Sequence, residues 1–130
     1  MKTETTSKAF GDVSVSHFEH STSHFLHFQF RGTFDLDQSL SAVEQWKKRC
    51  NEQPDVKFVH IWDCQQMSGF DMKARNAWLD QLRAKKDATE RIILVSENIF
   101  IRGAGRLMSK FTKHAMTVYK TYGEMSDKEL

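Results

Sequence analysis

The sequence has few of the residues that cross-link or interrupt a fold. Its 130 residues include two cysteines, one proline and six glycines. Cys50 and Cys64 lie far apart and form no Cys-x-x-Cys pair, so we expect reduced thiols rather than disulfides or a cysteine-based metal site. No proline-rich or glycine-rich linker divides the chain, and its length fits one domain.

Long hydrophobic runs are also missing. No stretch approaches the roughly 18 consecutive apolar residues that indicate a membrane-spanning helix. The first residues, MKTETTSKAFGD, are polar and lack the apolar core of a secretory signal. We therefore expect a cytoplasmic protein, for which a peripheral association with a membrane surface stays open.

Acidic residues are absent from one part of an otherwise nearly neutral chain. The 19 Lys and Arg residues against 17 Asp and Glu give a net charge of +2, which argues against a dedicated nucleic-acid-binding protein. Between Asn98 and Tyr122 there are five basic residues and no acidic one, which predicts a local positive patch. These five are Arg102, Arg106, Lys110, Lys113 and Lys120.

Hydrophobic residues make up 39% of the chain and recur with the periods of alternating strands and helices. The expected strands cover residues 13–19, 24–34, 56–63, 91–96 and 116–122. The expected helices cover residues 35–51, 70–86 and 99–114. The order β-β-α-β-α-β-α-β predicts an α/β fold with a mixed sheet, mostly parallel with an antiparallel N-terminal hairpin. We expect a polar N-terminal arm, a single domain and a polar tail, with boundaries at residues 1–11, 12–125 and 126–130.

The expected hairpin is rich in imidazoles, which are ligands suited to zinc or nickel. Its histidines are His17, His20, His24 and His27. A register that pairs these histidines would mix apolar and polar residues on each face of the hairpin. A register that places Val15 opposite Phe28 or Phe30 gathers the apolar side chains of both strands on the same face. We therefore predict the second register and no metal site.

Two stretches and the order of elements resemble a known family. DCQQMSGFDMKAR follows the expected central strand, and IILVSENIFIRGAGRLMSKFT combines a strand, a loop and a basic amphipathic helix. Together they are similar to the SpoIIAA-like (STAS-like) family of small bacterial proteins, over residues 13–125. The resemblance implies a mixed sheet with helices and no diagnostic catalytic residue. Members have been linked to partner switching or to binding apolar ligands at membranes, and many have no known activity.

The expected helix at 99–114 separates basic from apolar side chains. At about 100° per residue, the apolar side lies almost opposite the basic residues and consists of Phe100, Ala104, Leu107, Met108 and Phe111. One interpretation is that this apolar side packs in the core while the basic side faces solvent. The other is that the basic side meets anionic head groups or an acidic partner, which Ile99, apolar among the bases, favours. The candidate membrane or partner surface consists of Ile99, Arg102, Arg106, Lys110 and Lys113.

Gly103 and Gly105 lie inside the same helix, where each glycine costs roughly 1 kcal/mol relative to alanine. The pattern lacks a third glycine and a Lys-Ser/Thr pair, so it fits neither dinucleotide nor P-loop binding. Close packing against a neighbouring backbone is the expected reason for these glycines.

Residues 63–69 are expected to form a loop between a parallel strand and a helix, where α/β sheets usually place ligands. Ser68 would then be the N-cap of the helix. The resemblance suggests a second role, because anti-sigma-factor antagonists carry an Asp-Ser-Ser-Gly-like phosphoacceptor at the equivalent turn. Only Ser68-Gly69 of that motif is present here. Ser68 is therefore a possible phosphoacceptor.

Catalytic patterns are absent from the sequence, which has neither HExxH nor GxSxG. His60 and Cys64 would lie roughly 13 Å apart along a continuous strand, too far for a Cys–His pair. We therefore expect His60 to be a hydrogen-bonded core residue. We expect no enzyme activity, no catalytic residues, no cofactor and no metal.

The leading hypothesis is a non-catalytic regulatory or binding module for a small apolar or lipid-like ligand, at an anionic membrane surface. Arg102 and Arg106 would meet the polar end of the ligand. The alternative is a protein–protein partner switch controlled at Ser68, and a further possibility is homodimerisation through Phe18 and Phe25. No nucleic-acid partner is expected. The expected apolar lining of the ligand pocket is Trp62, Phe70, Met72, Trp78, Phe100 and Ile101.

Overall fold

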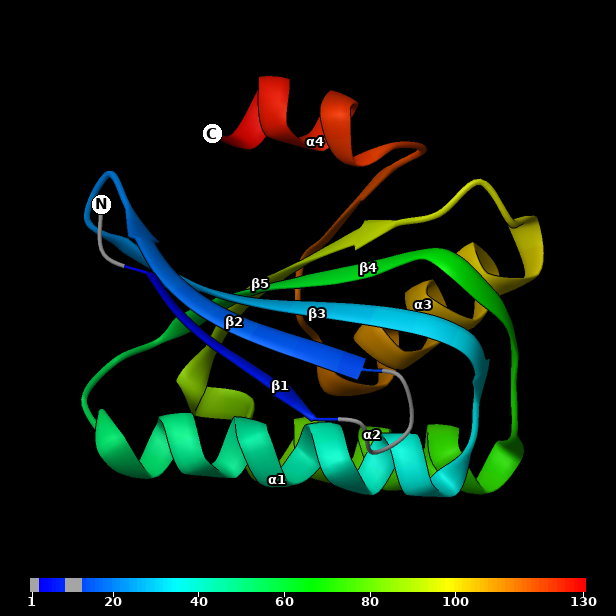
Figure 1. Cartoon of the computed structure of the whole chain (residues 1–130), viewed down its shortest axis with the longest axis horizontal. Helices are drawn as coiled ribbons and strands as arrows, with labels where there is room; N and C mark the ends of the chain where they lie inside the picture. The colour runs from blue at the N-terminus through cyan, green and yellow to red at the C-terminus, as the bar shows by residue number, and fades with distance from the viewer. Residues whose placement is uncertain (1–2, 9–12) are drawn as a thin grey trace.

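The computed structural model describes the backbone of residues 3–8 and 13–130 and the side chains of residues 13–130. Its six strands form one sheet in the order in which they occur along the chain (Figure 1). The pairs β1–β2 and β2–β3 are antiparallel, and the remaining neighbours are parallel. The strands are β1 (Thr3–Lys8), β2 (Val13–His20), β3 (Ser23–Phe34), β4 (Phe58–Phe70), β5 (Thr89–Val95) and β6 (Met116–Tyr119).

The helices cover both faces of this sheet unequally. Helices α1, α2 and α3 contribute to the larger core on one face, whereas the short helix α4 lies over the other face (Figure 1). Their bounds are α1 (Leu36–Glu52), α2 (Met72–Ala84), α3 (Ile99–Thr112) and α4 (Tyr122–Glu129), with a short 3-10 turn at Lys86–Ala88. Among the described residues, no helix has the length and apolar character needed to cross a membrane.

Alternation along the strands divides the core into two clusters. On the face covered by α1, α2 and α3, Phe28 and Trp62 pack around Trp78 with ring centroids 5.0 and 5.8 Å from it. On the opposite face, Phe18 and Phe25 stack at 5.0 Å in the cluster that α4 completes with Met125. Both phenylalanines are buried, so the idea that they are exposed aromatics for homodimerisation is wrong.

The hairpin register agrees with the apolar matching predicted from sequence. Val15 lies opposite Phe28, which confirms the prediction. Two histidines nevertheless meet diagonally across β2 and β3, with His17 Nε2 3.0 Å from His24 Nδ1. Among the described residues, no group of three or more His, Cys, Asp or Glu side chains is placed to hold a metal ion.

Three features of the chain were not predicted. Residues 3–8 of the expected polar arm form β1, an edge strand of polar sequence, while residues 1–2 and 9–12 lie outside the described residues. The expected polar tail belongs to α4. This helix has no clear hydrophobic periodicity in the sequence, because Met125 is the only residue of α4 that is buried. Strand β4 continues to Phe70 instead of ending at Asp63, because β3 pairs with it as far as Phe34 through two register shifts.

Candidate functional site

Helix α3 packs on the sheet through a face that combines two large apolar residues with three small ones. Its buried residues are Ile101, Gly105, Met108, Ser109 and Thr112. A Cβ atom built on Gly105 would lie only 2.8 Å from Leu94 Cδ2 in β5, so the glycine allows a close approach of helix and sheet. The prediction of close packing is confirmed at Gly105. At Gly103 it is wrong, because a Cβ there would have no neighbour within 4 Å.

This orientation leaves an apolar strip of α3 in solvent. Phe100, Leu107 and Phe111 recur at the i, i+7, i+11 spacing of one helix face. Their exposed fractions are 81%, 47% and 61%, and that of Ile99 at the helix start is 68%. The expectation that the apolar side packs in the core is therefore wrong for Phe100, Leu107 and Phe111, whereas Met108 of the same predicted side is buried. Hydrophobic periodicity correctly grouped the three exposed residues on one face of the helix, but it did not show that this face points to solvent. The face that contains Gly105, Ser109 and Thr112 packs on the sheet instead.

A basic strip runs along α3 beside the apolar one. Arg106, Lys110 and Lys113 are exposed and Arg102 is half-buried. None of these four side chains has a carboxylate within 4 Å among residues 13–130. Asn98 caps the helix by accepting hydrogen bonds from the amides of Phe100 and Ile101, at 2.9 and 3.3 Å. The exposed half of α3 is therefore apolar on one side and positively charged on the other.

Four of the residues expected to line a ligand pocket surround one cavity between α2, α3 and the sheet. They are Trp62, Phe70, Trp78 and Ile101. Met72 and Phe100 are exposed and do not line it, and neither do Arg102 and Arg106. The charged residue in the lining is Arg75 of α2, which sequence patterns gave no reason to choose.

The cavity is small. Its volume is about 50 Å³, and the indole rings of Trp62 and Trp78 form part of its wall. An apolar cavity that binds benzene has about 150 Å³. Arg75 donates to Asn76 Oδ1 at 3.3 Å, while its buried Nε has no hydrogen-bond partner. The cavity has room for a small group and not for a lipid chain.

Ser68 lies on an extended strand rather than in a turn. It is exposed in β4, and α2 begins after Asp71, so the expectation that Ser68 caps this helix is wrong. A phosphate on Ser68 would sit on the strand, three residues before the N-cap of α2. Its role as a phosphoacceptor stays a prediction.

The buried histidine and cysteine of β4 are held in their neutral forms. His60 is fully buried, and burial lowers its pKa to about 3. Its Nδ1 accepts a hydrogen bond of 3.2 Å from Trp62 Nε1, which confirms that it is a hydrogen-bonded core residue. Burial, followed by the nearby Asp63 carboxylate, raises the pKa of the Cys64 thiol. A neutral thiol is a poor nucleophile, so this strand provides no activated Cys–His pair.

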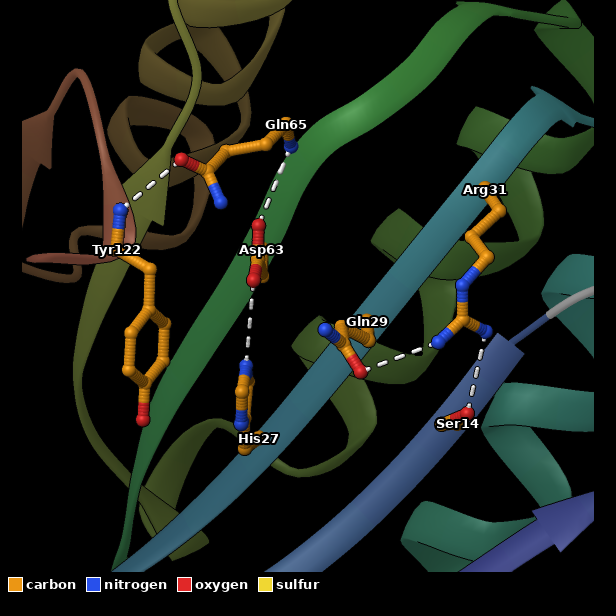
Figure 2. Close-up of polar contacts among 7 residues, drawn as sticks. All are labelled: Ser14, His27, Gln29, Arg31, Asp63, Gln65 and Tyr122. Carbon is orange, nitrogen blue, oxygen red and sulfur yellow. Dashed lines mark hydrogen bonds and ion pairs between the residues drawn. The ribbon is translucent and has the colours of Figure 1, made fainter.

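A row of polar side chains crosses the sheet face beside α4 (Figure 2). The buried carboxylate of Asp63 accepts a 3.2 Å hydrogen bond from the backbone amide of Gln65, and Asp63 Oδ2 lies 3.6 Å from His27 Nε2. The ring of Tyr122 stacks on His27 at 5.2 Å, which joins α4 to this row. Farther along, Arg31 donates to the neutral oxygens of Ser14 and Gln29, both at 3.3 Å. Sequence patterns did not single out this row, because its members alternate with core residues on three strands.

Neither the known protein families nor the curated proteins contain a match to this sequence. Solved structures do match its fold. An uncharacterised protein of the DUF3478 family with a SpoIIAA-like fold, from Shewanella loihica PV-4, aligns with a TM-score of 0.73 and 13% identity, over 94% of this chain and 96% of that one. The anti-sigma factor antagonist SpoIIAA in its unphosphorylated form aligns with a TM-score of 0.60 and 17% identity, over 89% and 96%.

The chain has a SpoIIAA-like fold. The predicted α/β architecture, with an antiparallel N-terminal part and a parallel remainder, is confirmed by these similarities and by the strand pairing. At 13% and 17% identity the similarity establishes the fold alone, so the function has to be argued from this chain's own surfaces.

Proposed function

We propose that this protein is a non-catalytic binding module that attaches to anionic membrane surfaces through α3. The observation that carries the proposal is the exposed apolar strip of Phe100, Leu107 and Phe111. It lies beside basic side chains that have no carboxylate within 4 Å among residues 13–130. Exposed aromatic and aliphatic residues next to Lys and Arg are the pattern of helices that lie in a membrane interface.

The expected strength is that of reversible attachment. Full burial of one Phe or Leu side chain contributes about 1.5–3 kcal/mol, and insertion into the interface would gain part of this for each member of the strip. Each basic residue near an anionic surface adds about 1 kcal/mol, a contribution that salt screens. Binding should therefore require both strips and should weaken at high ionic strength.

The surface of α3 supports lipid recognition better than the cavity beneath it does. The cavity of about 50 Å³ is a third of the volume that binds benzene. The exposed strip needs no such space. The apolar part of a lipid-like ligand is therefore assigned to a bilayer outside the protein rather than to a pocket inside it.

A protein–protein switch is the second candidate function. The support for it is the fold, which SpoIIAA shares, together with the exposure of Ser68 on β4. It predicts a kinase-like partner and loss of partner binding in Ser68→Asp. If Ser68→Asp and Ser68→Ala both capture a partner as the unmodified chain does, this candidate fails.

Vesicle flotation of paired variants tests the membrane proposal. Phe100→Ser with Phe111→Ser removes apolar contact, and Arg106→Gln with Lys110→Gln removes charge. Each pair should abolish most of the binding to anionic vesicles. The matched controls lie on α1, where Leu40 is 46% exposed and Lys47 and Lys48 are exposed. Leu40→Ser and Lys47→Gln with Lys48→Gln should bind normally, and the proposal fails if they lose as much binding as the α3 variants.

Sedimentation of the same variants separates the membrane from a second copy of the chain as the occupant of the strip. If the unmodified protein is a dimer that Phe100→Ser with Phe111→Ser dissociates, the strip is an interface between copies and the membrane proposal is wrong. A monomer whose vesicle binding depends on the strip supports it.

A further inference from the structure

The chain leaves the two adjacent parallel strands β5 and β6 toward opposite faces of the sheet. After β5 it enters α3, which packs with α1 and α2, whereas after β6 it enters α4 on the other face (Figure 1). In open α/β sheets, such a divergence of neighbouring connections opens a crevice outside the carboxyl ends of the strands, where ligands commonly bind.

A polar cavity of about 310 Å³ lies at this divergence. Its walls are residues 96–98 before α3, residues 120–121 before α4, and Cys64, Gln65 and Met67 of β4. Cys64 and Met67 also line the apolar cavity under α3, so the polar cavity adjoins apolar surface on that side. We call this cavity the switch crevice.

Gln65 of the crevice lies at a register shift between the parallel strands β3 and β4. Gln29 pairs with Asp63, but the next pair along the strands, Arg31 with Gln66, is shifted by one residue. A shift of this kind changes which way the side chains of the strand point. The Gln65 side-chain oxygen accepts a 3.0 Å hydrogen bond from the Tyr122 amide, as Figure 2 shows. Its NH2 group is thereby left to donate to a ligand.

The charges of the crevice favour an anion on the α4 side. The Lys120 ammonium has no carboxylate within 4 Å among residues 13–130, and only its backbone amide is bonded, to Glu124 Oε1 at 3.3 Å. Helices α3 and α4 both begin at the crevice, and helix starts carry partial positive charge. Two carboxylates oppose this charge, that of the exposed Glu97 on the α3 side and that of Glu124 in the first turn of α4.

We propose that the switch crevice binds a small organic anion. Lys120 pairs with the carboxylate or phosphate of this ligand, and the side-chain NH2 group of Gln65 donates a hydrogen bond to the same group. The apolar part of the ligand packs against Met67 and Cys64. This site is separate from the membrane-facing strip of α3 and does not depend on it.

The test is an NMR titration of the backbone amides with benzoate, and with benzyl alcohol as the uncharged counterpart. Benzoate should give saturable shifts at Asn98, Lys120 and Thr121, and benzyl alcohol should not. Lys120→Gln should weaken benzoate binding about two- to fivefold, the range for an exposed ion pair, and Glu97→Gln should strengthen it. Lys110→Gln, on α3 outside the crevice, is the matched control and should leave it unchanged.

Three results would overturn the proposal. These are no saturable shift with benzoate, equal shifts with benzyl alcohol, or equal affinity in Lys120→Gln and the unmodified chain. Phe100→Ser with Phe111→Ser should bind benzoate normally, which separates failure at the crevice from failure of the membrane proposal.

Discussion

Gly105 of α3 and Leu94 of β5 are in contact so close that a Cβ on the glycine would lie 2.8 Å from Leu94 Cδ2. This contact lies on the side of α3 that faces the sheet. The large apolar residues that would normally cover a core, Phe100 and Phe111, are consequently turned to solvent. The proposed membrane-binding strip is therefore exposed because a different face of α3, which includes Ile101, Gly105 and Met108, packs on the sheet.

The two glycines of α3 should respond in opposite ways to alanine. Gly103 has open space around it, so Gly103→Ala should raise the free energy of unfolding by roughly 0.5–1 kcal/mol through helix propensity. Gly105→Ala gains the same propensity but must displace Leu94, and overpacking a core costs about 1–3 kcal/mol. We expect a net loss of up to about 2 kcal/mol. Urea denaturation of both variants measures the difference, and a Gly105→Ala protein as stable as Gly103→Ala would contradict the packing described.

Apolar matching was sufficient to predict much of the fold from the sequence. It fixed the hairpin register at Val15 and Phe28, and doubly apolar runs identified the buried parts of β4 and β5. It could not find β1, whose polar sequence TETTSK forms an edge strand, or α4, which buries only Met125. A strand of polar sequence and a helix with one buried residue leave little periodic signal.

The candidate site was harder to predict because tertiary packing decides which face of α3 is exposed. The sequence separated the two strips of α3 but assigned the apolar one to the core, since periodicity treats apolar residues as buried and small polar ones as exposed. Ser109 and Thr112 do not follow that rule, because both are polar and buried against the sheet. Lys120 and Gln65 are 55 residues apart in the sequence. They line one crevice only because of the strand order and a register shift, neither of which a local pattern reveals.

The buried His60 should make the protein sensitive to mild acid. Burial lowers its pKa in the folded chain to about 3, whereas an unfolded histidine titrates near 6.5. The unfolded state therefore binds the proton first, and stability falls as the pH drops below about 6.5. The loss from this residue is about 2 kcal/mol between pH 7 and pH 5.

Urea unfolding at the two pH values, compared with His60→Gln, isolates this effect. The variant should lose less stability than the unmodified protein over the same interval, whatever its stability at pH 7. An NMR signal of the His60 ring that titrates near pH 6.5 in the folded protein would show that the side chain is not buried in its neutral form.

Helix α4 is held by a carboxylate that two side chains share. Glu129 accepts from Tyr119 Oη at 2.6 Å and from Arg91 at 2.9 Å. Burial and the hydrogen bond to Glu129 raise the pKa of Tyr119 to about 12. Because the Glu129 charge opposes ionisation of the phenol, Glu129→Gln should lower this pKa toward 10. Alkaline absorbance titration in a Tyr122→Phe background reports Tyr119 alone, and an unchanged titration would mean that the contact does not form in solution.

The most direct test of the membrane proposal is flotation of the unmodified protein with anionic and with neutral vesicles, at low and at physiological salt. We predict binding to anionic vesicles that weakens as salt rises and little binding to neutral ones, because both strips of α3 must act together. Failure to float with anionic vesicles at low salt, or equal flotation with both kinds of vesicle, would contradict the proposal.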